Sequence, residues 1–145
     1  SFNVAPTSTL FTGGTNIINS TDWFNFYCFA EKQGYSKFGS YIANANTNGP
    51  FVYTGFKPAF ILQKRINDTS NWHIFDIKRD TYNSMNKYLL PNDVSVESTA
   101  GAWDFLSNGF KVRSADNWQN QSGGSYIYMA FADEPLVGDN PATAR

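Results

Sequence analysis

Short β-like runs separated by turn residues recur along this chain, and they constrain its fold more than any other feature. Ala59 to Arg65 predicts a central strand, and Trp72 to Lys78 predicts its antiparallel partner. Asn108-Gly109 lies between two alternating runs, the strongest short-range hairpin signal. Ser125 to Asp133 predicts another interior strand. No segment has a helical period, so we expect no helix longer than about two turns and an all-β fold, an antiparallel β-sandwich or jelly-roll-like double sheet.

The composition agrees with a β fold and argues against two classes of partner. Aromatic residues make up 17% and charged residues 16% of the 145 residues, which is typical of a globular β protein. A net charge of -1 argues against nucleic-acid binding, which needs a basic face. No apolar run approaches the roughly 20 residues that span a bilayer, so no membrane insertion is expected. Cys28 is the only cysteine, and its aromatic neighbours predict a buried thiol.

One aromatic pattern occurs twice in the sequence. Residues 24 to 31 read FNFYCFAE and residues 126 to 133 read YIYMAFAD, and a glycine-turn hairpin and a polar loop precede each copy. The first copy predicts a strand from Trp23 to Glu31 that is buried on both faces, with Phe29 and Phe131 in equivalent buried positions. We therefore expect three parts: 1–31, the C-terminal part of a preceding β repeat; 32–133, a complete β-sandwich repeat; and 134–145, a C-terminal tail.

The partial repeat at the N-terminus has a consequence for assembly. Half a unit cannot bury its own sheet, and unpaired edges with a large apolar patch favour association. We expect a neighbouring subunit or the second unit of the same chain to cover the aromatic side chains of this part, and we expect a homo-oligomer. These side chains are Trp23, Phe24, Phe26 and Phe29.

Four longer motifs cover most of the chain. They are GYSKFGSY (34–41), GPFVYTGFKPAFILQKR (49–65), DFLSNGFKVR (104–113) and SGGSYIYMAFAD (122–133). Together they resemble a repeated β-sandwich domain of tail fibre or tail virion proteins of marine and environmental tailed phages, over roughly residues 8 to 140. Phe60 departs from the pattern, where Trp is common, and NANTNG replaces a more Gly-rich loop. The resemblance implies a structural or receptor-binding module on the exterior of a phage particle, and it brings no catalytic motif.

The residues that could support catalysis are few. His73, the only histidine, stands between two apolar residues of a predicted strand, which indicates a packed imidazole and no transition-metal site. A glycosidase would need two carboxylates across a cleft, and we expect Asp76, beside Lys78 and Arg79, to be ion-paired or on an exposed face instead. The other carboxylates near strands are Asp80, Glu97 and Asp104. The loops 65–71 and 114–120 offer oxygen ligands for Ca²⁺, but ordinary turns favour the same residues. We therefore expect no enzyme, no catalytic residues, no metal and no cofactor.

A polar loop supplies the candidate ligand site. Trp118 lies in SADNWQNQS, outside any alternating run, so its ring is the best candidate for an exposed aromatic surface. Asn117 and Asp116 precede it and offer hydrogen-bonding groups for a glycan. Packing of this loop over the sandwich is an equally good interpretation of Trp118. Three other tryptophans, in or near predicted strands, are expected in the core: Trp23, Trp72 and Trp103.

Three classes of function stand in order of preference. The first is a non-enzymatic structural virion component, a phage tail, fibre or appendage module on the particle exterior. Its partners would be other copies of itself and other virion proteins, with host surface glycan as a further contact. The second is a carbohydrate-binding β-sandwich module, and the third is a polysaccharide-degrading enzyme domain.

Overall fold

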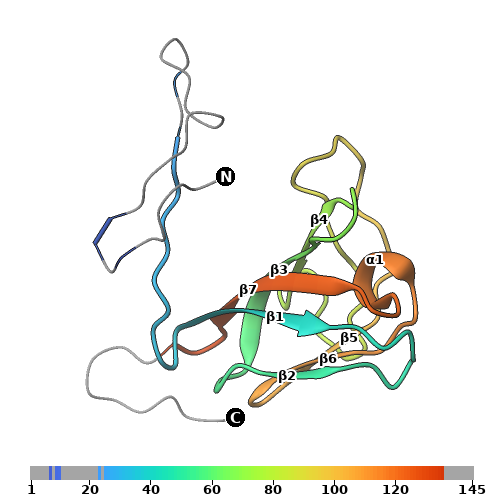
Figure 1. Cartoon of the computed structure of the whole chain (residues 1–145). Helices are drawn as coiled ribbons and strands as arrows, with labels where there is room; N and C mark the ends of the chain where they lie inside the picture. Colours follow the sequence, from blue (N-terminus) through green and yellow to red (C-terminus); the bar gives the residue numbers. More distant parts are fainter. Residues whose placement is uncertain (1–6, 8, 11–22, 24, 136–145) are drawn as a thin grey trace.

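A computed structural model describes residues 7, 9, 10, 23 and 25–135 of the chain. Within these residues the chain forms seven strands and one short helix (Figure 1). The strands form two antiparallel sheets, with the orders β1-β7-β3-β4 and β2-β6-β5. The elements are β1 (Ser36–Ile42), β2 (Phe51–Tyr53), β3 (Pro58–Arg65), β4 (Trp72–Asp76), β5 (Trp103–Leu106), β6 (Gly109–Val112), α1 (Asn117–Asn120) and β7 (Ser125–Ala132). The predicted all-β double sheet is confirmed.

The strongest strand and hairpin predictions are confirmed as well. β3 and β7 are the two interior strands of the four-stranded sheet, and β3 pairs with β4 in an antiparallel register. In the β5–β6 hairpin Leu106 lies opposite Gly109, so the two turn residues are Ser107 and Asn108. Gly109 opens β6, where a Cβ atom would collide with the backbone carbonyl oxygen of Val52. The close approach of β2 to this hairpin therefore requires glycine.

The core between the two sheets is built from stacked aromatic rings. Trp103 is completely buried, and its ring stacks on Phe75 with 4.8 Å and on Phe110 with 5.0 Å between ring centroids. Tyr41 stacks on Tyr126 at 4.9 Å, at the β1–β7 side of the same core. Rings of this size bury a large apolar area each, so they dominate the stability of the sandwich. The expected core position of Trp103 is confirmed, whereas Trp72 is only partly buried.

The four-stranded sheet is apolar on its outer side too. Side chains alternate between the two faces of a strand, and in β3 and β7 the residues that do not face the core are still mostly apolar and partly exposed. The strand registers bring these side chains into rows across four strands. We call this surface the outer face; its apolar residues are Phe38, Phe60, Leu62, Trp72, Ile74, Ile127, Met129 and Phe131.

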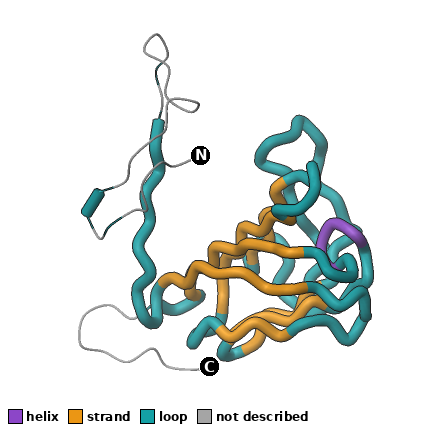
Figure 2. The backbone as a smooth tube through the Cα atoms, viewed as in Figure 1, coloured by secondary structure: helices purple, strands orange, loops and turns teal. Residues whose placement is uncertain are grey.

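The predicted strand from Trp23 to Glu31 is wrong for the residues that the structure describes. Residues 25–31 are extended but pair with no strand, and Figure 2 draws them as loop. Trp23 is fully exposed and the Cys28 thiol is exposed, so neither is the core residue that we expected. The reason is that no described strand lies beside this segment to complete a ladder. Figure 1 shows it leaving the sandwich as an arm, and we call residues 23 and 25–31 the aromatic arm.

Only part of the predicted internal repeat lies within the described residues. Residues 11–22 and 24, which carry much of the first copy, lie outside the described residues, so the domain boundaries stay a prediction. The predicted burial of Phe29 is wrong, because its side chain is 55% exposed while Phe131 is partly buried. Phe29 instead packs against Phe131, with 5.9 Å between ring centroids in an edge-to-face arrangement. The two residues are therefore neighbours in the folded chain.

The connection between β4 and β5 is the longest loop of the sandwich. Residues 77–102 form this loop, which Figure 2 colours as loop throughout. Its pairing is limited to isolated β-bridges, among them Ile74 to Leu89 and Tyr88 to Ser98. Among the described residues, no helix is long and apolar enough to cross a membrane.

Candidate binding site at the loop end of the sandwich

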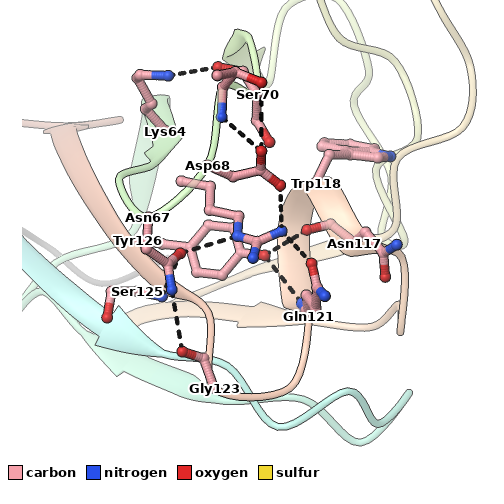
Figure 3. A network of polar contacts seen from close by, with 12 residues as sticks. Lys64, Asn67, Asp68, Ser70, Asn117, Trp118, Gln121, Gly123, Ser125 and Tyr126 are labelled. Atoms are coloured by element: carbon pink, nitrogen blue, oxygen red, sulfur yellow. Dashed lines mark hydrogen bonds and ion pairs between the residues drawn. The ribbon is translucent and has the colours of Figure 1, made fainter.

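Two polar loops meet at one end of the four-stranded sheet. The β3–β4 loop begins where β3 ends at Arg65, and the α1–β7 loop ends where β7 begins at Ser125. The backbone N–H of Ile66 donates to the carbonyl oxygen of Ser125 at 2.9 Å, and the side-chain oxygen of Asn67 accepts from the N–H of Ser125 at 3.3 Å. Figure 3 shows this meeting point, which brings the two Asn/Asp-rich stretches of the sequence together.

Arg65 holds the two loops together from the inner side of the sheet. Its side chain is only 10% exposed, and a buried charge requires partners. Nε donates to Asn67 Oδ1 at 3.0 Å, while Nη1 donates to Asp68 Oδ2 at 2.8 Å and to Gln121 Oε1 (Figure 3). The acceptors come from both loops. Arg65 therefore fixes the relative position of the loops, and the Asp68 carboxylate remains half exposed at the surface.

The short helix α1 carries a buried polar network behind this surface. The side chain of Gln119 is fully buried; its Oε1 accepts from the Trp103 indole N–H at 2.6 Å and its Nε2 donates to Asp116 Oδ2 at 3.2 Å. Its backbone carbonyl accepts from the Tyr41 hydroxyl at 2.9 Å. Buried amides of this kind are stable when each donor and acceptor has a partner. The network ties α1 to both sheets.

Asn120 completes the network on the other side of α1. Its side chain is fully buried, and Nδ2 donates to Asn44 Oδ1, to the carbonyl of Asn46 and to the carbonyl of Ser114. Its Oδ1 accepts from the backbone N–H of Asn44 at 2.9 Å. A single amide thus connects the β1–β2 loop with the segment before α1. No sequence signal marks this role, because Asn120 looks like any other loop asparagine.

The structure separates the three residues predicted for ligand binding. Asp116 and Asn117 are exposed, although Asp116 Oδ2 also accepts from the Ser114 hydroxyl at 2.7 Å. Of the two alternatives for Trp118, an exposed ring and a packed ring, the structure has the packed one. It is partly buried and stacks on His73, with 4.2 Å between ring centroids and 19° between the planes. The ring face toward His73 is therefore unavailable for stacking on a sugar, and the alternative prediction, packing of this loop over the sandwich, is confirmed.

His73 occupies the core position predicted for it. It is 4% exposed, and burial lowers the pKa of its imidazole from 6.5 to about 4, so it is neutral at pH 7. Gln63 lies directly opposite on β3 and is fully buried. Its Nε2 donates to the carbonyl of Trp118 at 3.2 Å. Trp118 and Tyr88 lie against His73, which closes this imidazole off from solvent.

The carboxylates considered for catalysis make local structural contacts. Arg79 bridges Asp76 at 3.0 Å and Glu97 at 2.7 Å, which confirms the ion pair predicted for Asp76. Asp104 pairs with Arg113, while Asp80 accepts from two backbone N–H groups of the β4–β5 loop. No group of three or more His, Cys, Asp or Glu side chains that could hold a metal ion occurs in the described part of the chain.

The comparisons with known proteins place the chain in a family. A family model described as "Domain of unknown function (DUF7483)" matches residues 1–135. The chain belongs to the DUF7483 family. The range matched by the DUF7483 model includes both the aromatic arm and the sandwich. No curated protein matches the chain. No solved structure matches it either.

Proposed function

We propose that this chain is a non-enzymatic structural module of a virion appendage, such as a phage tail or tail fibre, on the exterior of the particle. The observation that carries the proposal is the pairing of an exposed aromatic arm with an apolar outer face on the same domain. A sandwich with an apolar outer face and an exposed aromatic arm is suited to assembly with other proteins. The phage motifs quoted above support the choice of a virion.

The chemistry of the polar residues supports a structural role over a catalytic one. His73 is stacked under Trp118 and neutral at pH 7. Three of the carboxylates near strands are bound in ion pairs with Arg79 and Arg113, and Asp80 caps backbone N–H groups. Groups held in this way stabilise loops and are poorly placed to exchange protons with a substrate.

Mass spectrometry of purified particles tests the proposal directly. Trypsin cleaves after Arg65 and Lys78, so residues 66–78 form a peptide that identifies the chain. We expect this peptide in particles of the parent phage after density-gradient purification and nuclease treatment. Its presence in the infected-cell lysate together with its absence from purified particles would refute a virion role.

A second candidate function is glycan binding at the loop end. It rests on the exposed polar side chains of the two loops, among them Asn67, Asp68 and Asn117 (Figure 3), and on exposed Asp116 next to Asn117 in sequence. Titration with host surface polysaccharide, followed by calorimetry and product analysis, separates the classes. Binding without cleavage that is lost in Asp116→Ala/Asn117→Ala supports this candidate, cleavage indicates an enzyme, and no heat of binding excludes both.

A further inference from the structure

The aromatic arm presents rings that the rest of the described chain does not cover. Trp23 is 101% exposed and Tyr27 is 83% exposed. Single exposed apolar side chains are common on proteins, but several aromatic rings on one short extended segment form a patch of the kind that marks a binding surface. An extended segment of this composition is suited to docking on an apolar surface.

The base of the arm is held firmly to the sandwich. The Ser36 hydroxyl donates to the carbonyl of Ala30 at 2.9 Å, and the backbone N–H of Lys32 donates to the Ser36 side-chain oxygen at 3.1 Å. Glu31 and Lys37 form an ion pair at 2.6 Å. These contacts fix the direction in which the arm leaves, and Figure 1 shows that it leads away from the sheets.

The outer face has the chemistry of an interface core. One row across four strands reads Phe38, Met129, Leu62, Ile74, and the bridge from Ile74 to Leu89 extends it by one residue. Aromatic residues and methionine are enriched, and charged residues depleted, at the centre of protein interfaces. Charged side chains of β3 and β4 on this side of the sheet, Lys64 and Asp76, lie on either side of the Leu62–Ile74 row.

The arm and the outer face already fit each other at one corner. The Phe29 ring lies 5.9 Å from that of Phe131 and 6.2 Å from that of Phe38, both on the outer face. Trp23 stands six residues earlier, up to about 20 Å further along an extended chain. Because the arm runs away from its own sheet, its outer rings do not reach the remaining rows of that sheet. The same rows are available on a second copy.

The surface areas are of the size that a stable complex needs. Aromatic side chains bury about 150–250 Å² each, so the exposed parts of Trp23, Tyr27 and Phe29 offer about 400–550 Å² per arm. Two reciprocal contacts, each covering a similar area of outer face, would bury about 1,600–2,200 Å² in total. Stable specific interfaces bury about 1,200–2,000 Å².

We propose that the aromatic arm of one copy docks on the outer face of a second copy, and that the chain assembles through exchanged arms. The occupant of the outer face is therefore another molecule of this chain, with Trp23 and Tyr27 seated over the row of Leu62 and Met129. This inference deepens the proposed structural role, since it names the partner and both halves of the contact. Exchange of identical segments between copies is a low-cost route to closed symmetric assemblies.

Two variants of the full chain separate the halves of the contact. The arm variant, Trp23→Ser/Tyr27→Ser, changes side chains that are exposed in the single chain. The face variant, Leu62→Glu/Met129→Lys, places opposite charges on residues that lie directly across the β3–β7 pair, which a sheet tolerates. The matched control, Val94→Ser/Val96→Ser, removes exposed apolar side chains from another surface, at 102% and 86% exposure.

Sedimentation equilibrium gives the outcomes. We expect the parent and the control to form the same oligomer, and each of the two variants to dissociate with a Kd raised by about 30-fold or more, as for loss of an aromatic hot spot. An equimolar mixture of the two variants should form a pair, weaker than the parent complex because one arm–face contact remains.

Three results would overturn the proposal. They are a monomeric parent at all concentrations, an arm variant that assembles like the parent, and a mixture of folded variants that does not associate. If circular dichroism shows that the face variant is unfolded, the arm variant decides alone. A monomeric parent leaves the proposed virion role open, because the peptide search in purified particles tests that role independently.

Discussion

Replacing Asn120 with alanine tests whether the buried network at α1 stabilises the sandwich. The substitution removes three donated hydrogen bonds and one accepted hydrogen bond from a fully buried amide. The carbonyl of Ser114 loses a partner inside the protein, whereas the carbonyl of Asn46, in an exposed loop, can turn to water. A buried group left without a partner costs about 1–3 kcal/mol, and the cavity adds to this.

We expect Asn120→Ala to lower the free energy of unfolding by about 2–4 kcal/mol. For a chain of 145 residues this corresponds to a fall in Tm of roughly 5–15 °C. The assay is urea unfolding followed by tryptophan fluorescence, at one fixed protein concentration because assembly would shift the midpoint. The measured change applies to the cooperative transition of the sandwich.

Asn117→Ala is the matched control for this measurement. It is the same substitution, three residues earlier in the same helix and at an exposed position. The hydrogen bond from the Tyr126 hydroxyl is accepted by the backbone carbonyl of Asn117, which alanine retains. We expect it to change the free energy of unfolding by less than about 0.5 kcal/mol. Equal effects at Asn117 and Asn120 would refute the reasoning, because burial and hydrogen bonding would then make no difference.

Three further predictions follow from single residues. Arg65→Met should destabilise the chain by about 1–3 kcal/mol and speed hydrogen exchange in residues 66–71, since the half-exposed Asp68 carboxylate can rehydrate; unchanged exchange would contradict its role in holding the loops. The pKa of His73 is about 4 in the folded chain, below the 6.5 of the unfolded chain. As the pH falls from 6.5 towards 4, the unfolded chain therefore binds a proton at this imidazole before the folded chain does, and the parent loses stability. Relative to His73→Phe, the unfolding free energy of the parent should fall by about 2–3 kcal/mol over that range, and parallel pH curves would exclude this. Gly109→Ala should destabilise by more than about 2 kcal/mol, because its Cβ meets the Val52 carbonyl, whereas Gly123→Ala, with φ +68° and open space around the Cβ, should cost about 1 kcal/mol; thermal melts of the two compare them.

Local sequence signals were enough to predict the sheets of this fold. Two runs, Ala59 to Arg65 and Ser125 to Asp133, are apolar on both faces. Runs of this kind occupy interior strands, where neighbouring strands cover both edges and the core covers one face. The Asn108-Gly109 pair located the β5–β6 hairpin, but the two-residue turn is Ser107-Asn108, one residue earlier than that pair, and Gly109 opens β6. Both predictions depend on residues close together in sequence.

The errors concern positions whose surroundings come from distant segments. Trp118 follows polar residues, so the sequence left an exposed ring and a packed ring equally open; the packing comes from His73 and Tyr88, more than 25 residues away, which lie against its ring. The arm has the composition of a strand, yet a strand needs a neighbour, and the described chain provides none beside residues 25–31. The roles of Gln119 and Asn120 were missed for the same reason, since a buried amide and a loop amide look alike in sequence.

Photo-crosslinking from the arm tests whether the aromatic arm of one copy docks on the outer face of a second copy. Cys28 is the only cysteine and is exposed on the arm, so a maleimide–benzophenone probe attaches there without any substitution. Labelled chain of natural isotopic composition is mixed with unlabelled ¹⁵N-enriched chain, equilibrated, irradiated and digested with trypsin. If arms are exchanged between copies, we expect crosslinks between a light arm peptide and ¹⁵N peptides that carry β3, β4 or β7. Crosslinks confined to light peptides, or ¹⁵N crosslinks away from the outer face, would contradict it.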